Sequence, residues 1–269
     1  MKDPHEHHTV SAPGPTAILE AVAVTQRFGE ALAVDGVSLA IAGGEIAGLI
    51  GPNGAGKTTL FDILAGDRRP TAGAVRLNGR AVERKPADAR LAAGLGRTFQ
   101  IPRPFGALTV AENVMLGRQG HPGERVWPNW LASARVQRAE RETYERAMEL
   151  LELVTLAPLA QEPARNLSGG QRKLLELARV LIAEPAIVLL DEPSAGVHPA
   201  LLETIAARVA ALNAAGMTFL IIEHNLELVA RLCDHVYVMA AGRLLCEGTP
   251  SEVVRDARVI EAYVGGRAA

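Results

Sequence analysis

The sequence predicts an α/β protein built on a mainly parallel sheet with helices on both faces. One basis is the order of patterns around Gly51. The apolar run Ile46–Ile50 precedes a glycine-rich loop, and the helix-patterned run Leu60–Ala65, closed by Gly66, follows it. The other basis is the alternation of buried strand patterns with helical patterns over residues 172–239. Parallel strands joined by crossover helices produce such an alternation.

The glycine-rich loop is the most specific motif, because it fits G-x-x-x-x-G-K-[ST] in a strand–loop–helix setting. Its glycines allow backbone N–H groups to surround a phosphate at the positive end of the helix. We expect Lys57 to reach the β- and γ-phosphates and the Thr58 hydroxyl to ligate Mg²⁺. The alternative is a glycine-rich turn that matches by accident. The nucleotide-binding residues predicted here are Gly51, Pro52, Asn53, Gly54, Ala55, Gly56, Lys57, Thr58 and Thr59.

Size and composition limit the possible classes. The 269 residues, 48% hydrophobic and 22% charged, suit one large soluble domain or one domain with an inserted subdomain. A net charge of −2 shows no general nucleic-acid footprint, so no nucleic-acid partner is expected. No apolar run approaches the ~20 residues of a membrane span. Cys233 and Cys246 lack metal-ligand spacing and are interpreted as small buried hydrophobes in a reducing cytosol.

The N-terminal stretch is polar and rich in histidine and proline, without the apolar segment of a secretory signal. His5, His7 and His8 could bind a metal, but a disordered leader over residues 1–16 is favoured.

The first ninety residues are β-rich around one phosphate-loop helix. Strand patterns cover residues 18–24 and 34–41, and Gly43–Gly44 predicts a turn. Asn78–Gly79 is a hairpin signal.

Residues 99–170 are predicted to be a mostly helical insertion, with a surface loop over 119–128. Over 140–156, Glu142 and Arg146 form a possible i,i+4 pair. The opposite, apolar face holds Tyr144, Ala147, Met148, Leu151 and Val154.

After the insertion, a capping box with proline at the first helical position stands at Thr249–Glu252. Helices are predicted over 172–183, 199–215 and 225–232, and strands over 187–190, 217–222 and 236–239.

Asp191 and Glu192 follow the strand pattern 187–190. A carboxylate at the C-terminal end of a parallel strand points into the crevice where α/β sheets bind ligands. Asp191 suits Mg²⁺ held through water, and Glu192 suits a general base for an attacking water. The alternative is a solvated strand end.

The run Leu167–Gln171 precedes the helix predicted to start near Arg172. It is either a serine helix cap or a second anion site at a helix N-terminus, and composition does not choose between the two.

From Ile18 to Gly266 the chain resembles the ATP-binding subunits of ABC (ATP-binding cassette) transporters. The elements follow in family order: the loop 51–59, Gln100, the signature 167–171, the strand with its carboxylates 187–192, and His224. The resemblance implies ATP and Mg²⁺ as cofactors and a P-loop NTPase (RecA-like) core with an antiparallel β subdomain and an inserted α-helical subdomain. A single domain would then span 17–266, with the core and β subdomain in 17–98 and 171–266 and the helical signature subdomain in 99–170.

The resemblance also implies roles for single residues. Phe28 would stack on adenine, the alternative being a core aromatic. Gln100 would sense Mg²⁺ and the attacking water, and His224 would contact the γ-phosphate. The catalytic set is thus Glu192, His224 and Gln100, and the metal set Thr58, Gln100 and Asp191. The signature of one subunit, Ser168, Gly169, Gly170 and Gln171, would close over the phosphate loop of a second cassette.

A closer resemblance is to the longer ATPase subunit of branched-chain amino-acid importers, in the runs 97–100, 108–114 and 259–265. Importers of urea, amides and other amino acids share this pattern. The resemblance implies a cytoplasmic protein, peripheral on the inner face of the membrane, with permease subunits and an identical or different second cassette as partners. One departure is Val197–His198, where most cassettes have a Leu-Asp pair, and the sequence does not indicate what His198 does instead.

Two rival readings come from other classes. A soluble ABC protein acting on DNA or the ribosome would carry two cassettes or a long coiled coil, and residues 59–167 are too few for one. A stand-alone phosphate-loop kinase would lack the signature. An ABC transporter with another cargo, such as urea, amides or lipid, is also possible.

The segment 100–108 is predicted to receive a membrane subunit. Its prolines and glycine disfavour a helix or central strand, yet Ile101, Phe105 and Leu108 are apolar. These side chains either fold back on the helical insertion or stay exposed for the permease, and the family resemblance favours exposure.

Overall fold

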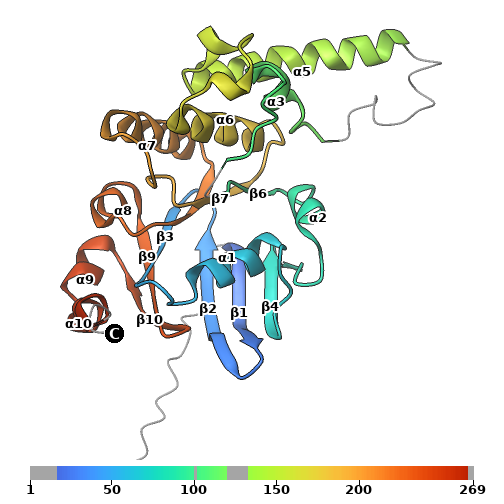
Figure 1. Ribbon diagram of the computed structural model, residues 1–269. Coiled ribbons are helices and arrows are strands. Elements are labelled where there is room, and N and C mark those ends of the chain that lie inside the picture. Colours follow the sequence, from blue (N-terminus) through green and yellow to red (C-terminus); the bar gives the residue numbers. More distant parts are fainter. Residues whose placement is uncertain (1–16, 100–101, 120–132, 266–269) are drawn as a thin grey trace, which may run out of the picture.

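The computed structural model describes residues 17–99, 102–119 and 133–265. The predictions for the leader 1–16, for Gln100 and Ile101, and for all but the first residue of the loop 119–128 therefore lie outside the described residues. Within those residues the strands form a four-stranded sheet of order β2-β1-β4-β5 and a six-stranded sheet of order β10-β9-β3-β8-β7-β6 (Figure 1).

The smaller sheet is antiparallel and confirms the β-rich reading of the first ninety residues. Its pairing brings Ala21 opposite both Leu39 and Val75. Asn78 and Gly79 both have positive φ, 49° and 72°, which is what a two-residue type I′ hairpin requires. Its strands are β1 (Ala17–Phe28), β2 (Ala31–Ala42), β4 (Ala72–Leu77) and β5 (Arg80–Ala81).

The larger sheet is parallel except for its edge strand β10, as the alternating pattern predicts. The interior strands β3, β7 and β8 are buried along their whole length, because helices or the second sheet cover both faces. The strands are β3 (Ile46–Ile50), β6 (Leu95–Arg97), β7 (Ile187–Asp191), β8 (Thr218–Ile222), β9 (His235–Ala240) and β10 (Arg243–Gly248).

Helix α1 (Lys57–Ala65) lies between the two sheets (Figure 1). Leu60, Phe61 and Leu64 are fully buried there in one cluster with Leu49 of β3. Gly66 ends the helix in the left-handed conformation, φ 94°, and its N–H donates to the carbonyl of Asp62, as predicted.

The other face of the six-stranded sheet is covered by helices. Buried side chains of α3, α5 and α6 belong to one cluster with Val188, Ile221 and Val236 of the sheet. Figure 1 shows these three helices stacked beyond the end of β7. The helices are α2 (Ala87–Leu91), α3 (Val110–Met115), α5 (Ser133–Leu153), α6 (Gly169–Leu181), α7 (Pro199–Ala214), α8 (Leu226–Leu232), α9 (Pro250–Arg255) and α10 (Ala257–Gly265).

Three expectations for the helices are wrong in detail. The helix predicted over 140–156 is α5, which ends at Leu153 because Thr155 adopts positive φ, 62°. Tyr144 is 38% exposed rather than core, and its hydroxyl accepts a hydrogen bond from Gln161. Arg146 pairs with Glu149 at 2.7 Å, not with Glu142.

Two further corrections concern burial and helix starts. Cys233 is buried as expected, but Cys246 is only partly buried because it stands on the edge strand β10. Helix α6 begins at Gly169, three residues before Arg172, because Ser168 is its N-cap. Among the described helices, none is both long and apolar enough to cross a membrane.

Candidate functional site

The phosphate loop leaves β3 and enters α1 with its glycines in positive-φ conformations. Gly51 has φ 148°, and a Cβ there would lie 2.1 Å from the carbonyl oxygen of Met239. Gly56, the N-cap of α1 with φ 94°, would place a Cβ 2.2 Å from the oxygen of Ala33. Glycine is therefore required at both positions by conformation and by contact with β2 and β9.

Lys57, the first residue of α1, turns its ammonium back into this loop. Its Nζ donates to the carbonyl oxygens of Gly51 at 2.7 Å and Pro52 at 2.9 Å. The side chain is buried, and burial lowers the pKa of Lys57 while the neighbouring carboxylate of Glu192 raises it. A phosphate bound by the loop amides would face this cation. Thr58, the next residue, is exposed at the start of the same helix.

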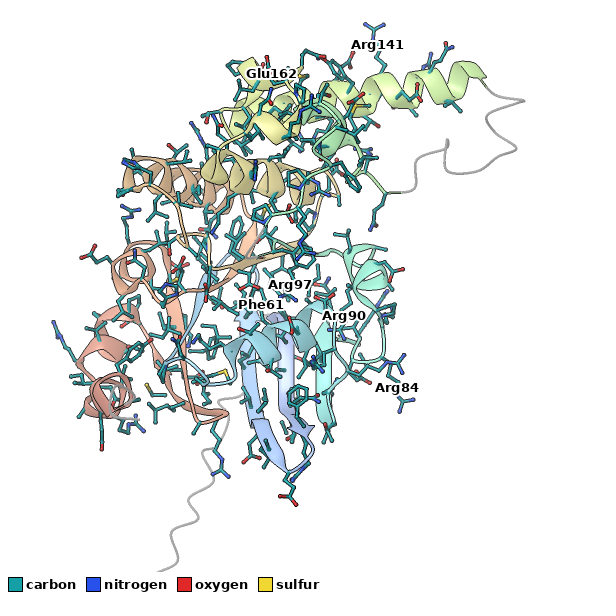
Figure 2. All side chains as sticks on the ribbon, in the orientation of Figure 1. Phe61, Arg84, Arg90, Arg97, Arg141 and Glu162 are labelled. Carbon is teal, nitrogen blue, oxygen red and sulfur yellow. The ribbon has the colours of Figure 1, made fainter. Side chains whose placement is uncertain are left out.

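Asp191 ends β7 and is held by Arg97 from the neighbouring strand β6. Arg97 Nη2 donates to Asp191 Oδ2 at 3.0 Å, and Nη1 donates to Asp62 at 2.8 Å and to Asp67 at 2.5 Å. Burial raises the pKa of Asp191, and the hydrogen bond from Arg97 lowers it. Figure 2 shows Arg97 beside Phe61 of α1, where its guanidinium carbon lies 5.1 Å from the ring centroid.

Glu192 and His224 come together at the ends of the adjacent strands β7 and β8. Glu192 Oε1 lies 3.7 Å from His224 Nδ1. The backbone N–H of Glu192 donates to the oxygen of Ile222, and its φ of 44° is left-handed, a rare conformation for a side chain with a Cβ. The structure therefore brings together two of the three residues predicted to be catalytic.

Lys173 of α6 is a contact that the sequence analysis missed. Its Nζ donates to the carbonyl oxygens of Glu192 at 2.7 Å and Pro193 at 3.3 Å. Arg97 was missed in the same way, since it stood only inside a family motif. The sequence offered no signal for Arg97, because its strand β6 is only three residues long and shows no periodic pattern.

The signature residues form the N-terminus of α6. Ser168 Oγ accepts from the N–H of Gln171 at 3.3 Å, and Gln171 Oε1 accepts from the N–H of Ser168 at 2.8 Å. This capping box confirms the interpretation of Ser168 as a helix cap. Ser168 and Gly169 are exposed, whereas Gly170 is buried and a Cβ there would lie 2.0 Å from Leu201. Their contact with a nucleotide stays a prediction.

Two lone residues have clear positions. Phe28, at the end of β1, is 44% exposed, so it is not a core aromatic, and the guanidinium of Arg68 lies 4.7 Å from its ring centroid. His198 is the N-cap of α7, where its Nδ1 accepts from the N–H of Ala200 at 3.3 Å. Adenine stacking by Phe28 stays a prediction, and His198 has a structural role as a helix cap.

The segment before α3 presents an exposed apolar surface. Phe105 is 56% exposed, and Phe99 is exposed as well, as is Leu116 at the C-terminal end of α3. The loop is fixed from beneath by the buried Asn113, which accepts from the N–H of Phe105 and donates to its oxygen. Nearby lies a groove of about 260 Å³, lined in part by Leu91, Arg97, Phe99, Gly117, Glu176 and Arg179. Phe105 therefore does not fold back into the helical segment, while Leu108 is half-buried.

The chain matches two known protein families, one over its central part and one at its C-terminal end. The ABC transporter family matches residues 34–195, and the branched-chain amino acid ATP-binding cassette transporter family matches residues 243–269. The chain is 37% identical over 250 residues to LivG of Archaeoglobus fulgidus, a probable branched-chain amino acid transport ATP-binding protein, covering 93% of this chain and 96% of that protein.

Two further similarities agree with these matches. BraF of Pseudomonas aeruginosa, a high-affinity branched-chain amino acid transport ATP-binding protein, is 38% identical over 249 residues, 92% of this chain and 98% of that protein. The crystal structure of a nucleotide-free ATP-binding cassette from an ABC transporter superposes with a TM-score of 0.80 at 37% identity, covering 91% of this chain and 98% of the other.

Proposed function

The chain belongs to the ABC transporter family of ATP-binding cassettes, and we propose that it is the ATPase subunit of an importer of branched-chain amino acids. The proposed ATPase activity rests on one observation: the C-terminal edge of the parallel sheet brings together four side chains, those of Lys57, Asp191, Glu192 and His224. The cargo is inferred from what the relatives transport.

We propose the following division of work at this edge. The loop amides and the Lys57 ammonium bind the β- and γ-phosphates of ATP. The carboxylate of Glu192 accepts the proton of the attacking water, and His224, 3.7 Å from it, contacts the γ-phosphate. No covalent intermediate on the protein is needed, because positioning and charge neutralisation account for most of phosphoryl-transfer catalysis.

The donor set suits Mg²⁺. Thr58 and Asp191 offer hydroxyl and carboxylate oxygens, the hard ligands this ion prefers, and Asp191 suits contact through water. Mg²⁺ bound there would neutralise charge between the β- and γ-phosphates. Gln100 is proposed as the third member of this set on the family resemblance alone.

The partners we propose are a second cassette and permease subunits. The exposed Ser168 and Gly169 at the N-terminus of α6 would close over the phosphate loop of the second cassette. The exposed Phe105 and the groove beside it would receive the permease, which would hold the protein at the inner face of the membrane.

The test is transport by the reconstituted complex. The chain would be combined in proteoliposomes with the permeases and second cassette that co-purify with it from membranes. We expect ATP-dependent uptake of leucine, isoleucine and valine, and none with Lys57→Ala in this subunit. Uptake of urea or short amides in place of these amino acids would refute the cargo, and no ATP-dependent uptake of any of them would refute an importer.

A further inference from the structure

Glu223 is a fully buried carboxylate with a complete set of donors around it. It follows β8 directly and is 0% exposed. Its Oε1 accepts from the N–H of Ser194 at 2.8 Å. Its Oε2 accepts from the Ser194 hydroxyl at 2.8 Å and from the N–H groups of His224 at 3.1 Å and Asn225 at 3.2 Å. Both oxygens act only as acceptors, which is the pattern of an ionised carboxylate.

These contacts join the two segments that carry the proposed catalytic residues. Ser194 stands two residues after Glu192, and His224 is the residue next to Glu223. A single rigid side chain therefore spans the loop after β7 and the loop after β8. The 3.7 Å approach of Glu192 to His224 lies between these same two loops, which the Glu223 carboxylate bridges.

Glu223 holds the segment Glu192–Ser194, whose backbone is strained at Glu192. Glu192 has a φ of 44°, a strained left-handed conformation that a residue with a Cβ keeps only where its surroundings enforce it. Lys173 binds the Glu192 carbonyl from the α6 side, and Glu223 binds Ser194 from the β8 side. The main chain of Glu192 is thus fixed on both sides of its side chain.

Lys173 also supplies the positive charge that a buried carboxylate requires. Burial lowers the pKa of Lys173, and the carboxylates of Glu223 and Glu192 raise it, so both act on the same ammonium. Glu223 is therefore a hydrogen-bonded link between the loop after β7 and the loop after β8 rather than an isolated polar group in the core.

We propose that Glu223 is a positioning residue for ATP hydrolysis: acting through Ser194 and the backbone of His224, it sets the geometry of Glu192 and His224 without contacting the nucleotide. The inference rests on the proposed roles of those two residues. It predicts that loss of the carboxylate impairs turnover and spares ATP binding, because the phosphate loop is built from β3 and α1.

Glu223→Gln tests this in the full-length protein. An amide keeps one acceptor oxygen, and its NH2 must face either the Ser194 N–H or the N–H groups of His224 and Asn225. In steady-state phosphate release at saturating ATP and Mg²⁺, we expect kcat to fall about 10- to 100-fold. The Kd for ATP should stay within about threefold, since no phosphate contact is lost.

Two more variants separate positioning from simple destabilisation. Ser194→Ala removes only the hydroxyl donor and should lower kcat about threefold to tenfold. Thr218→Val is the matched control: Thr218, at the opposite end of β8, is 1% exposed and its hydroxyl accepts from the N–H of Gly44 at 2.8 Å. It should lower the melting temperature and leave kcat within about twofold.

The outcomes are distinct. If Glu223→Gln releases phosphate at the wild-type rate per bound ATP, the inference is overturned. It is also overturned if Thr218→Val, with a melting temperature equal to that of Glu223→Gln, loses as much kcat as Glu223→Gln does. Should Glu223→Gln not fold, Ser194→Ala decides, and an unchanged kcat overturns the inference. Full turnover in a Glu192→Gln protein would instead overturn the proposed function, on which this inference depends.

Discussion

Arg97 Nη2 donates a 3.0 Å hydrogen bond to Asp191 Oδ2, and the same guanidinium binds Asp62 and Asp67 with its other amino group. The side chains of Arg97 and Asp191 are 11% and 8% exposed, so this pair is shielded from water. One cation thus neutralises carboxylates from α1, from the loop after it and from β7. The proposed metal carboxylate is tied to the helix that binds phosphate.

Arg97→Gln should therefore destabilise the protein. Removing one partner of a buried ion pair leaves uncompensated charge, which costs about 3–5 kcal/mol. Urea unfolding would measure this loss. Arg76→Gln is the matched control, because Arg76 forms a 3.8 Å pair with Glu20 and is 50% exposed, and it should change stability by less than about 1 kcal/mol. Equal effects of the two substitutions would show that the Arg97 cluster is not structurally important.

Lys57→Ala should weaken ATP binding about 10- to 100-fold, since a hydrogen bond from a charged group contributes roughly 1.5–3 kcal/mol. Titration calorimetry with ATP gives the affinity directly. The exposed Lys85 provides a control, and Lys85→Ala should bind like the wild type. An unchanged affinity in Lys57→Ala would remove this lysine from the proposed phosphate site.

Glu192→Gln should keep ATP binding and stop turnover, because an amide cannot accept the proton of the attacking water. A general base contributes about 10²- to 10⁴-fold, so phosphate release should fall by that factor. With the partner cassette present, ATP should hold the dimer together, which gel filtration would detect. Glu203→Gln, at an exposed position on α7, should hydrolyse normally. Normal phosphate release by Glu192→Gln would rule out the assigned role.

Phe105→Asp should leave the isolated subunit folded and able to bind ATP, yet abolish uptake by the assembled transporter. The side chain is 56% exposed, so a charge there removes little packing, while an apolar docking contact would be lost. Thermal stability and ATP binding of the purified protein are compared with uptake in proteoliposomes. Tyr144→Asp, at another exposed aromatic of the helical segment, should retain uptake. Normal uptake with Phe105→Asp would exclude Phe105 from docking.

The features predicted correctly from the sequence are those formed by residues that are consecutive in the chain. The strand, loop and helix around Gly51 follow one another directly, and so do β7 and its carboxylates. The family resemblance drawn from these motifs is confirmed by the matches to ABC cassettes, and the α/β fold class is confirmed with it.

The features missed depend on residues far apart in the chain. Arg97 forms ion pairs with Asp62 and Asp191, and these residues come close to it only in the folded protein. Glu223 stands beside His224 in sequence, but its tie to Ser194 exists only because β7 and β8 are neighbours. Strand β6 is three residues long, and β10 is a partly exposed edge strand, so neither shows a periodic pattern.

The shared core on the helical face of the six-stranded sheet has a thermodynamic consequence. Leu151 of α5 belongs to the same buried cluster as Val188 and Val236 of the sheet, so the helical segment and the sheet should melt as one cooperative unit. Calorimetry should show a single transition, with the van't Hoff enthalpy equal to the measured one. Leu151→Ala, a cavity costing about 2–5 kcal/mol, should then lower the melting of β3 and of the phosphate loop as much as that of α5 itself.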